Sequence, residues 1–279
     1  MGLRINTNVA SLNSRRHLFN TTNNFNKSME KLASGMRINR AGDDAAGLAI
    51  SEGLKSDIRA LDQASRNAAD GISMVQVAEG SLDEVSTILM RMRELAEQAA
   101  TDTLGASERD YLNQEYQELI SEIDRISATA EFNGIPLLDG SAGTLNVQVG
   151  IGTDVATSAV SIDLSSPMDS TTLALAGTSI AGADGSTARA LLDDIEDATS
   201  TVSSTRAAFG AAQNRLETTI RNIAMTSENL SAANSRIRDV DVASETSKMT
   251  SLQILQQAGV SVLTQANMTS QLALSLLQG

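Results

Sequence analysis

Only a few side chains in this sequence could do chemistry, and their spacing supports no catalytic site. One histidine, His17, is present and cysteine is absent, which excludes a multi-histidine metal site, a thiolate site and a cysteine nucleophile. The carboxylate pairs Asp43–Asp44 and Asp193–Asp194 could act as acid and base. Both pairs fall at predicted helix N-termini, where carboxylates stabilise the helix dipole. The run Gly150–Gly152 lacks a following helix and lysine, so it is not a phosphate loop. We therefore expect no enzyme activity, no cofactor and no metal.

The composition favours long helices over a compact aromatic core. The chain has 279 residues, of which 41% are hydrophobic, but only 2% are aromatic and none is tryptophan. Two prolines leave helices almost uninterrupted. The net charge of −13 disfavours nucleic acid and anionic membranes as partners, because both repel an acidic surface. The first twenty residues do not resemble a signal peptide, and no stretch is apolar enough to insert in a membrane.

Two series of apolar residues repeat every seven positions, which is typical of helices that pack along one seam. The two series are equally long, so we expect the helices to pair antiparallel along their whole length. The first series is Leu54, Leu61, Ala68, Val75, Leu82, Leu89 and Ala96, and the second is Ile195, Val202, Phe209, Leu216, Ile223, Leu230 and Ile237.

Between these helices the sequence predicts a third helix and a small β region. Ser107 is expected to cap the third helix and Asn133–Gly134 to end it. The stretches Leu145–Val149 and Val160–Leu164 alternate apolar and polar residues, which predicts a hairpin at the far end of the bundle. Ser186 is expected to cap the returning helix. The predicted fold class is mainly α, a long antiparallel coiled-coil or helical bundle with a small β-hairpin region in the middle.

The two ends of the chain are the most unusual part. No charged residue occurs from Met249 to the C-terminus. This stretch is too polar to span a membrane and too apolar to be a stable solvated helix alone, so it needs a partner. Identical copies packing side by side in a contact that does not close would form a helical filament. The predicted parts are terminal coiled-coil arms (1–41 plus 240–279), a helical bundle (42–134 plus 188–239) and a short β-rich surface segment (135–187).

Apolar side chains of the two arms are the predicted assembly residues, because burying each leucine contributes roughly 2 kcal/mol. They are Leu18, Phe25, Leu32, Leu255, Val262, Leu263, Leu272 and Leu276.

Several motifs resemble those of the bacterial flagellin family. They are Met1–Asn8, Leu32–Asn39 and Ala41–Ile50 in the first half, and Ile237–Asp241 and Leu274–Leu277 in the second. The resemblance covers roughly residues 1–140 and 188–279. The middle lacks the family's large outer domains, so the chain resembles a minimal flagellin.

This resemblance implies a structural subunit that self-assembles into the helical flagellar filament for swimming motility. The terminal arms would form the inner tube of the filament, the bundle would form the outer tube, and the middle segment would face solvent. The subunit would be exported unfolded by the flagellar type III system and reside in the extracellular filament. Its implied partners are other copies of itself, an export chaperone, the filament cap and hook-associated proteins.

Two other functions remain open at this point. The flagellar hook–filament junction protein has similar ends, and a secreted coiled-coil adhesin could share the heptads. The zinc protease found in the variable region of some flagellins is excluded, because no histidine follows His17.

The resemblance also implies a contact with an animal immune receptor. In flagellins sensed by Toll-like receptor 5, the contact includes an arginine, a leucine four residues later and a glutamate on the next helix. Arg91, Leu95 and Glu115 match these positions. Arg91 lies about 200° around the helix from Leu89 at roughly 100° per residue, so it is expected to point outward.

Overall fold

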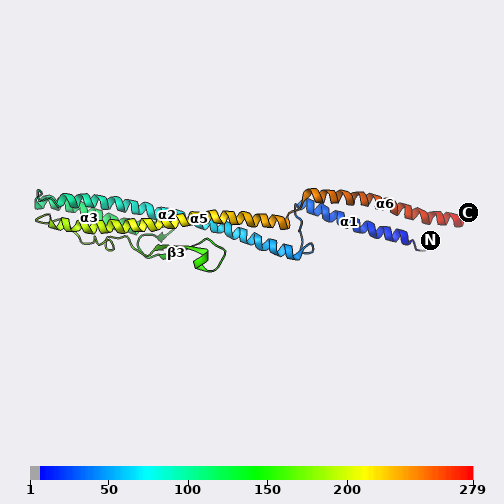
Figure 1. Ribbon diagram of the computed structural model, residues 1–279, viewed down its shortest axis with the longest axis horizontal. Helices are drawn as coiled ribbons and strands as arrows, with labels where there is room; N and C mark the ends of the chain where they lie inside the picture. Colours follow the sequence, from blue (N-terminus) through cyan, green and yellow to red (C-terminus); the bar gives the residue numbers. More distant parts are fainter. Residues whose placement is uncertain (1–6, 279) are drawn as a thin grey trace. The chain divides into compact units, whose positions relative to one another are not determined.

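The computed structural model describes residues 7–278, with side chains as far as Met268. It confirms a mainly α fold with small antiparallel strand pairs (Figure 1). The chain divides into two compact units, one made by Asp57–Glu228 and the other by Met1–Ser56 with Asn229–Gly279. The elements are α1 (Val9–Ser34), α2 (Ala45–Ala99), α3 (Ala106–Thr129), β1 (Glu131–Phe132), β2 (Ile135–Pro136), β3 (Gly143–Gln148), α4 (Val155–Ser158), β4 (Ala159–Leu164), α5 (Ser186–Arg238) and α6 (Val242–Gln278).

The unit Asp57–Glu228, called the bundle here, is built on α2, α3 and α5, which lie side by side (Figure 1). Ion pairs between the helices include Arg91–Glu115 at 2.8 Å and Arg206–Asp83 at 3.0 Å. The predicted heptad seams are its core, as each of their members in this unit is buried. They are Leu61, Ala68, Val75, Leu82, Leu89 and Ala96 on α2, and Ile195, Val202, Phe209, Leu216 and Ile223 on α5.

The middle of the chain is fastened to α3 by polar side chains. The hydroxyl groups of Tyr116 and Thr178 lie 3.1 Å apart, and the Asn113 side-chain oxygen accepts from the Ile180 amide at 3.0 Å. Ile180 and Leu175 are completely buried. The segment 135–187, expected to face solvent, therefore also adds apolar side chains to the bundle core.

The predicted hairpin is confirmed, but its place in the bundle is not. Strands β3 and β4 pair antiparallel, with Leu145 opposite Ile162. Val147 packs on α2 at Gly71, where an added Cβ would come within 3.1 Å of the Val147 Cγ2. The hairpin thus lies beside the middle of α2 instead of at the far end of the bundle. Gly71, which has no side chain, leaves room for the strand there.

Three predicted helix ends need correction. Helix α3 begins at Ala106 after Gly105, and no side chain caps it, so Ser107 lies within its first turn. It ends at Thr129. The pair Asn133–Gly134 instead turns β1 into β2 with φ angles of 52° and 77°, as type I′ hairpin turns require. At α5, Ser186 is the first helical residue instead of the cap before it, and the Asp184 carboxylate accepts from its amide and hydroxyl groups.

Of the two carboxylate pairs predicted at helix N-termini, only the first lies at one. Asp44 immediately precedes α2 and accepts from the Gly47 amide at 2.9 Å, as a capping residue does. Asp193 and Asp194 lie in the third turn of α5, beyond the free amides of its first turn.

In the second unit, α1 and α6 lie antiparallel and side by side (Figure 1). Helix α1 ends at Ser34, and Gly35 follows it with a left-handed φ of 70° that suits glycine. The Gly35 carbonyl accepts from the Val240 amide at 3.0 Å, and the Arg37 amide donates to the Arg238 carbonyl at 2.6 Å. Arg238 also pairs with Glu52 at 2.5 Å. These bonds hold the end of α1 beside the start of α6.

Candidate assembly surfaces

The seam between α1 and α6 keeps heptad spacing but mixes polar with apolar residues. Among the described seam residues only Ser28 is almost fully buried, at 1% exposed, and its hydroxyl donates to the Glu245 carboxylate at 2.5 Å. Leu18 packs on Gly259, where an added Cβ would lie 3.2 Å from the Leu18 Cδ1. The seam residues are Ser11, Ser14, Leu18, Thr21, Phe25, Ser28 and Leu32 on α1, and Glu245, Met249, Leu252, Gln256, Gly259, Leu263 and Ala266 on α6.

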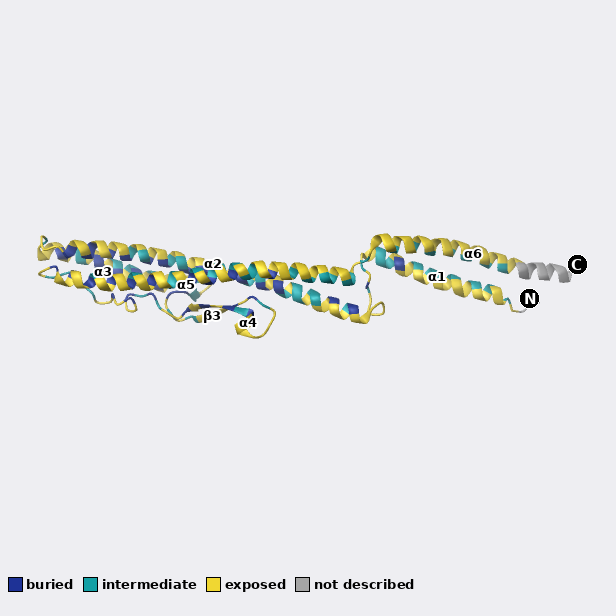
Figure 2. Cartoon of the chain, in the orientation of Figure 1, coloured by how far each residue is buried: buried dark blue, intermediate teal, exposed yellow. Residues whose placement is uncertain are grey.

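The outer faces of the two helices carry apolar side chains in contact with solvent. On α6, Ile254 is 61% exposed and Leu255 is 57% exposed. Figure 2 shows exposed surface along much of both helices. Burying such side chains is the main favourable term in protein association. We define this exposed apolar set as the outer face: Val9, Leu12, Phe19 and Met29 on α1, and Val242, Ile254, Leu255, Val260, Val262 and Met268 on α6.

The predicted assembly residues separate into three groups. Leu18, Phe25, Leu32 and Leu263 are half-buried in the seam between α1 and α6. Leu255 and Val262 lie on the outer face. Leu272 and Leu276 lie beyond the residues whose side chains the structure describes. The sequence reasoning missed Leu12, Phe19 and Ile254, although their signal was present as apolar residues outside the heptad seam.

The predicted receptor-contact residues are only partly brought together. Arg91 forms ion pairs with Glu115 at 2.8 Å and with Glu94 at 2.9 Å. The carboxylates of Glu94 and then Glu115 raise the pKa of Arg91 above its usual value. Leu95, at 1% exposed, lies in the bundle core. Its predicted contact with a receptor stays a prediction.

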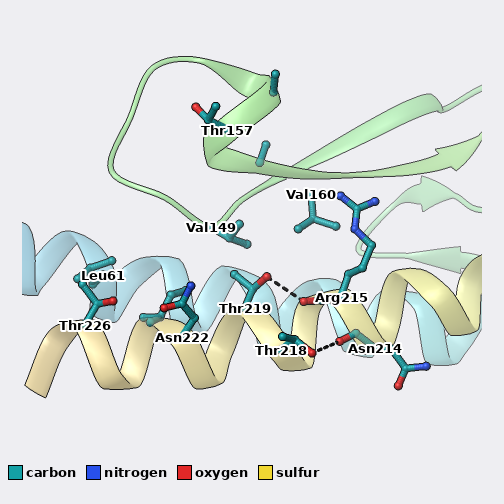
Figure 3. A pocket seen from close by; sticks show the side chains of 13 residues that line it. Leu61, Val149, Thr157, Val160, Asn214, Arg215, Thr218, Thr219, Asn222 and Thr226 are labelled. Atoms are coloured by element: carbon teal, nitrogen blue, oxygen red, sulfur yellow. Dashed lines mark hydrogen bonds between the residues drawn. The ribbon is translucent and has the colours of Figure 1, made fainter.

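A groove of about 670 Å³ lies between α5 and the β3–β4 hairpin (Figure 3). Its apolar lining includes Leu61, Val149, Val160 and Ile223, which are buried in the bundle, and two alanines, Ala156 and Ala159. Its polar rim comes mainly from one face of α5, and includes Asn214, Thr218, Asn222 and Thr226. Arg215 is the charged residue of the lining, and its side chain extends from α5 toward Val160 in Figure 3. Nothing in the sequence pattern indicated this groove.

Neither a metal site nor a membrane span is found in the part of the chain that the structure describes. No group of three histidine, aspartate or glutamate side chains there could hold a metal ion. None of the helices, over those same residues, combines the length and apolar character needed to cross a membrane.

Two family profiles match this chain. "Bacterial flagellin N-terminal helical region" matches residues 5–143 and "Bacterial flagellin C-terminal helical region" matches residues 192–277. The chain is 48% identical to a flagellin of Halalkalibacterium halodurans over 275 residues, covering 98% of this chain and 99% of that protein. It is 44% identical to a flagellin of Bacillus subtilis over 311 residues, covering 99% of this chain and 100% of that one. The flagellar filament 33 kDa core protein of Treponema phagedenis is 42% identical, covering 98% and 99%.

Solved structures resemble it as well. The crystal structure of Bacillus cereus flagellin matches with a TM-score of 0.50 and 30% identity, over 61% of this chain and 94% of that one. A hook-associated protein from Vibrio parahaemolyticus matches with a TM-score of 0.58 over 71% of this chain and 100% of that one. At 15% identity, the second likeness concerns the fold alone.

Proposed function

The chain belongs to the bacterial flagellin family and is a structural subunit of the flagellar filament, and we propose that α1 and α6 hold neighbouring subunits together. It lacks a large outer domain, since only residues 144–191 lie between the two matched family profiles. The junction protein and the adhesin considered above are not favoured by these matches.

The observation that carries the proposal is the outer face of α1 and α6. Ile254 and Leu255 are more than half exposed in a stretch with no charge after Lys248. Two helices can bury only one stripe of each against the other, so the remaining apolar surface needs further helices. Other copies of the chain carry the same surface, and an unclosed repeat of the contact extends into a filament.

Ile254→Lys tests the proposal. The side chain is 61% exposed in the single chain, so the stability of the monomer should change by no more than about 0.5 kcal/mol. A lysine ammonium buried between copies lacks a partner in this charge-free stretch, so filament formation should be abolished. Polymerisation onto wild-type filament fragments is measured by sedimentation. Ile254→Met keeps an apolar side chain and should polymerise; normal growth by the lysine variant would refute the proposal.

We also propose that each part of the chain has its own position in the filament. The arms 1–41 plus 240–279 form the inner part of the filament, 42–134 plus 188–239 form the bundle around it, and 135–187 lies outermost. The subunit is exported through the flagellar type III system to the extracellular filament. The exposed apolar side chains of α6 support a need for an export chaperone before assembly. The filament cap and hook-associated proteins complete the partners expected from the family.

A contact with Toll-like receptor 5 is proposed for Arg91, Leu95 and Glu115. The side chains of Arg91 and Glu115 are about half exposed. Arg91→Ala should lower the signal of free monomer in a receptor reporter assay. Arg93→Ala, with a side chain 54% exposed on the same helix, is the matched control. Leu95→Ala is no clean test, because loss of a buried leucine destabilises the bundle itself. Equal signals from the Arg91 and Arg93 variants would contradict the contact.

A further inference from the structure

Charge is divided unevenly along this chain, and α1 lies in its basic part. Residues 1–42 contain seven arginines and lysines but one carboxylate, Glu30. Their net charge is therefore +6 (seven minus one), which leaves −19 for residues 43–279 in a chain of −13. The overall charge disfavours anionic partners, but the surface of α1 has the opposite sign. Local charge decides the attraction at close range, because salt screens charges beyond about 8 Å.

The basic side chains of α1 lie on the side of the helix away from α6. Lys27 follows the seam residue Leu18 by nine positions, which places it about 180° around the helix at roughly 100° per residue. Arg16 lies on the same side as Lys27, and Arg15 beside it is also exposed. The Arg16 guanidinium donates to the Asn13 side-chain oxygen at 2.9 Å. Neither arginine forms an ion pair within the part of the chain that the structure describes, so both charges are available to a partner.

Apolar side chains lie next to these bases. Leu12 and Phe19 lie about 40° and 60° around α1 from Arg16, and they are 52% and 66% exposed. Exposed apolar side chains beside bases are typical of helices that lie in the interface of an anionic bilayer. There the apolar groups enter the boundary of the acyl chains, while long arginine side chains keep their charge among the headgroups. This face of α1 offers both kinds of contact.

A polar hollow of about 580 Å³ continues this face toward the loop after α1. Its lining includes Asn20, Asn23 and Lys27, together with Arg40 and Glu30, which pair at 2.7 Å. Side-chain amide and ammonium groups donate hydrogen bonds to phosphate oxygens. Because Arg40 neutralises Glu30, Lys27 gives the hollow a net positive charge. The hollow is therefore suited to a phosphate group.

The α1–α6 pairs of other copies lack the negative charge that this surface needs. The carboxylates that the structure describes on α1 and α6 are Glu30 and Glu245. Glu30 pairs with Arg40, and Glu245 accepts from Ser28 and lies 3.7 Å from Lys248. No charged residue follows Lys248. A phospholipid bilayer, by contrast, supplies phosphate groups and an apolar layer together.

We propose that α1 of the free subunit binds the surface of an anionic phospholipid bilayer and lies at the level of the headgroups without spanning it. Leu12 and Phe19 enter the acyl boundary, Arg15 and Arg16 lie among the phosphates, and the hollow at Lys27 takes one headgroup phosphate. This partner goes beyond the filament function proposed above and does not depend on it. Leu12 and Phe19 also belong to the outer face, so a bilayer and neighbouring copies compete for them, and the binding belongs to the subunit before assembly.

Flotation with lipid vesicles tests the proposal on full-length monomer. The protein should float with phosphatidylcholine vesicles that contain about a third phosphatidylglycerol at ~0.05 M salt, and should be released at ~1 M salt. Vesicles of phosphatidylcholine alone should leave it in solution. Inorganic phosphate at the ionic strength of a chloride control should not release it, because the free anion makes no apolar contact. Equal flotation with both vesicles, flotation with neither, or release by phosphate would overturn the proposal, as would salt-sensitive binding to single-stranded RNA without flotation.

Paired substitutions locate the contact. Arg15→Gln with Arg16→Gln should weaken binding to the anionic vesicles about thirtyfold, and Phe19→Ser should weaken it about tenfold. Arg59→Gln with Arg66→Gln is the matched control, because both arginines are exposed on α2 and the same charge is removed. It should change binding by less than about threefold. All five side chains are exposed, so each variant should unfold at the urea concentration of wild type. Equal losses from the two arginine pairs would overturn the proposal, because the net charge of the chain, and not α1, would then govern binding.

Discussion

The bundle and the α1–α6 pair are built on the same heptad spacing but bury it to very different degrees. In the bundle, Leu82 and Leu89 have no exposed surface. In the α1–α6 pair, Leu18 and Leu263 occupy equivalent seam positions and are only half-buried. The bundle seam has more neighbours, because α3 and the middle of the chain lie beside α2 and α5 and add buried side chains such as Tyr116 and Ile180. Beside α1, the structure records contacts from the following loop, where Arg40 pairs with Glu30.

The seam composition follows the same difference. Members of the bundle seams are Leu, Ile, Val, Phe and Ala throughout, which suits a dry core. The seam of the α1–α6 pair mixes Ser11, Ser14, Thr21 and Gln256 with leucines, and leucine and isoleucine are also found on its outer face. A bundle that folds alone puts its apolar residues inside. A pair that is completed by other copies needs them on the outside too.

A matched pair of leucine substitutions, one in each region, should give the largest difference in monomer stability. Leu89→Ala removes a side chain with no exposed surface and should lower the free energy of unfolding of the monomer by about 3–5 kcal/mol. Leu255→Ala, on the outer face at 57% exposed, should change it by less than about 0.5 kcal/mol. Urea denaturation of monomers measures both.

The filament should reverse that order of sensitivity. If copies bury Leu255, its loss costs about 2 kcal/mol at each contact, and the monomer concentration needed for growth rises about thirtyfold. Equal monomer destabilisation by the two substitutions, or normal growth of the Leu255 variant, would contradict the contrast between the two regions.

Two arginines extend the comparison to polar contacts, with a smaller expected effect. Arg109 in the bundle is 1% exposed and donates to the carbonyl groups of Ala99, Thr101 and Ala183 at 2.8–3.1 Å. Arg109→Met leaves buried carbonyls without a donor and should cost about 2 kcal/mol of monomer stability.

Its counterpart beside the α1–α6 pair is Arg37, which is exposed and donates to the Ile237 carbonyl at 2.7 and 3.2 Å. Water can replace that donor, so Arg37→Met should cost less than about 1 kcal/mol. Thermal unfolding of both variants gives the comparison. A larger loss of stability from Arg37→Met than from Arg109→Met would show that exposure does not determine how much these hydrogen bonds stabilise the protein.

Repeating patterns were predictable from the sequence, and single contacts were not. The seam from Leu61 to Ala96 was predicted because seven-residue spacing has one structural meaning over such a length. Strands β3 and β4 were predicted because their residues alternate. The burial of Leu95 was not predictable in this way, because it lies six residues after Leu89, about 240° around α2 at roughly 100° per residue, and is nevertheless 1% exposed.

The remaining features depend on contacts between segments distant in the sequence. Arg109 lies in a run of charged residues, and nothing local distinguishes it from an exposed arginine. Ile180 is buried because Asn113 and Thr178 fasten its segment to α3, and the segment itself has no period. Asn133–Gly134 carried a correct turn signal, but the same pair can end a helix or join two strands. Only the pairing of β1 with β2 decides between them.

The smallest expected effect concerns the pKa values of two exposed carboxylates, one beside each region. In the loop after α1, the Asp43 carboxylate accepts from the backbone amides of Arg40 and Asn39 at 3.2 Å, and these bonds lower its pKa. In the bundle, Arg189 lies 3.0 Å from Asp102 and lowers the pKa of that carboxyl group. A pKa lowered by folding stabilises the protein above the unfolded value, near 3.9, and this contribution is lost as pH falls through the folded pKa.

Salt should separate the two carboxylates, because ions screen an exposed pair of charges but hardly weaken bonds from two neutral backbone amides. When salt is raised from ~0.05 M to ~1 M, the pKa of Asp102 should move toward its ordinary value, while that of Asp43 should stay low. Carboxyl chemical shifts followed through an acid titration measure both, with Asp102→Asn and Asp43→Asn identifying the signals. Arg189→Met should raise the pKa of Asp102 as salt does and leave Asp43 unchanged. A salt response at Asp43 as large as that at Asp102 would mean that nearby lysine charges, and not the loop amides, hold its carboxylate.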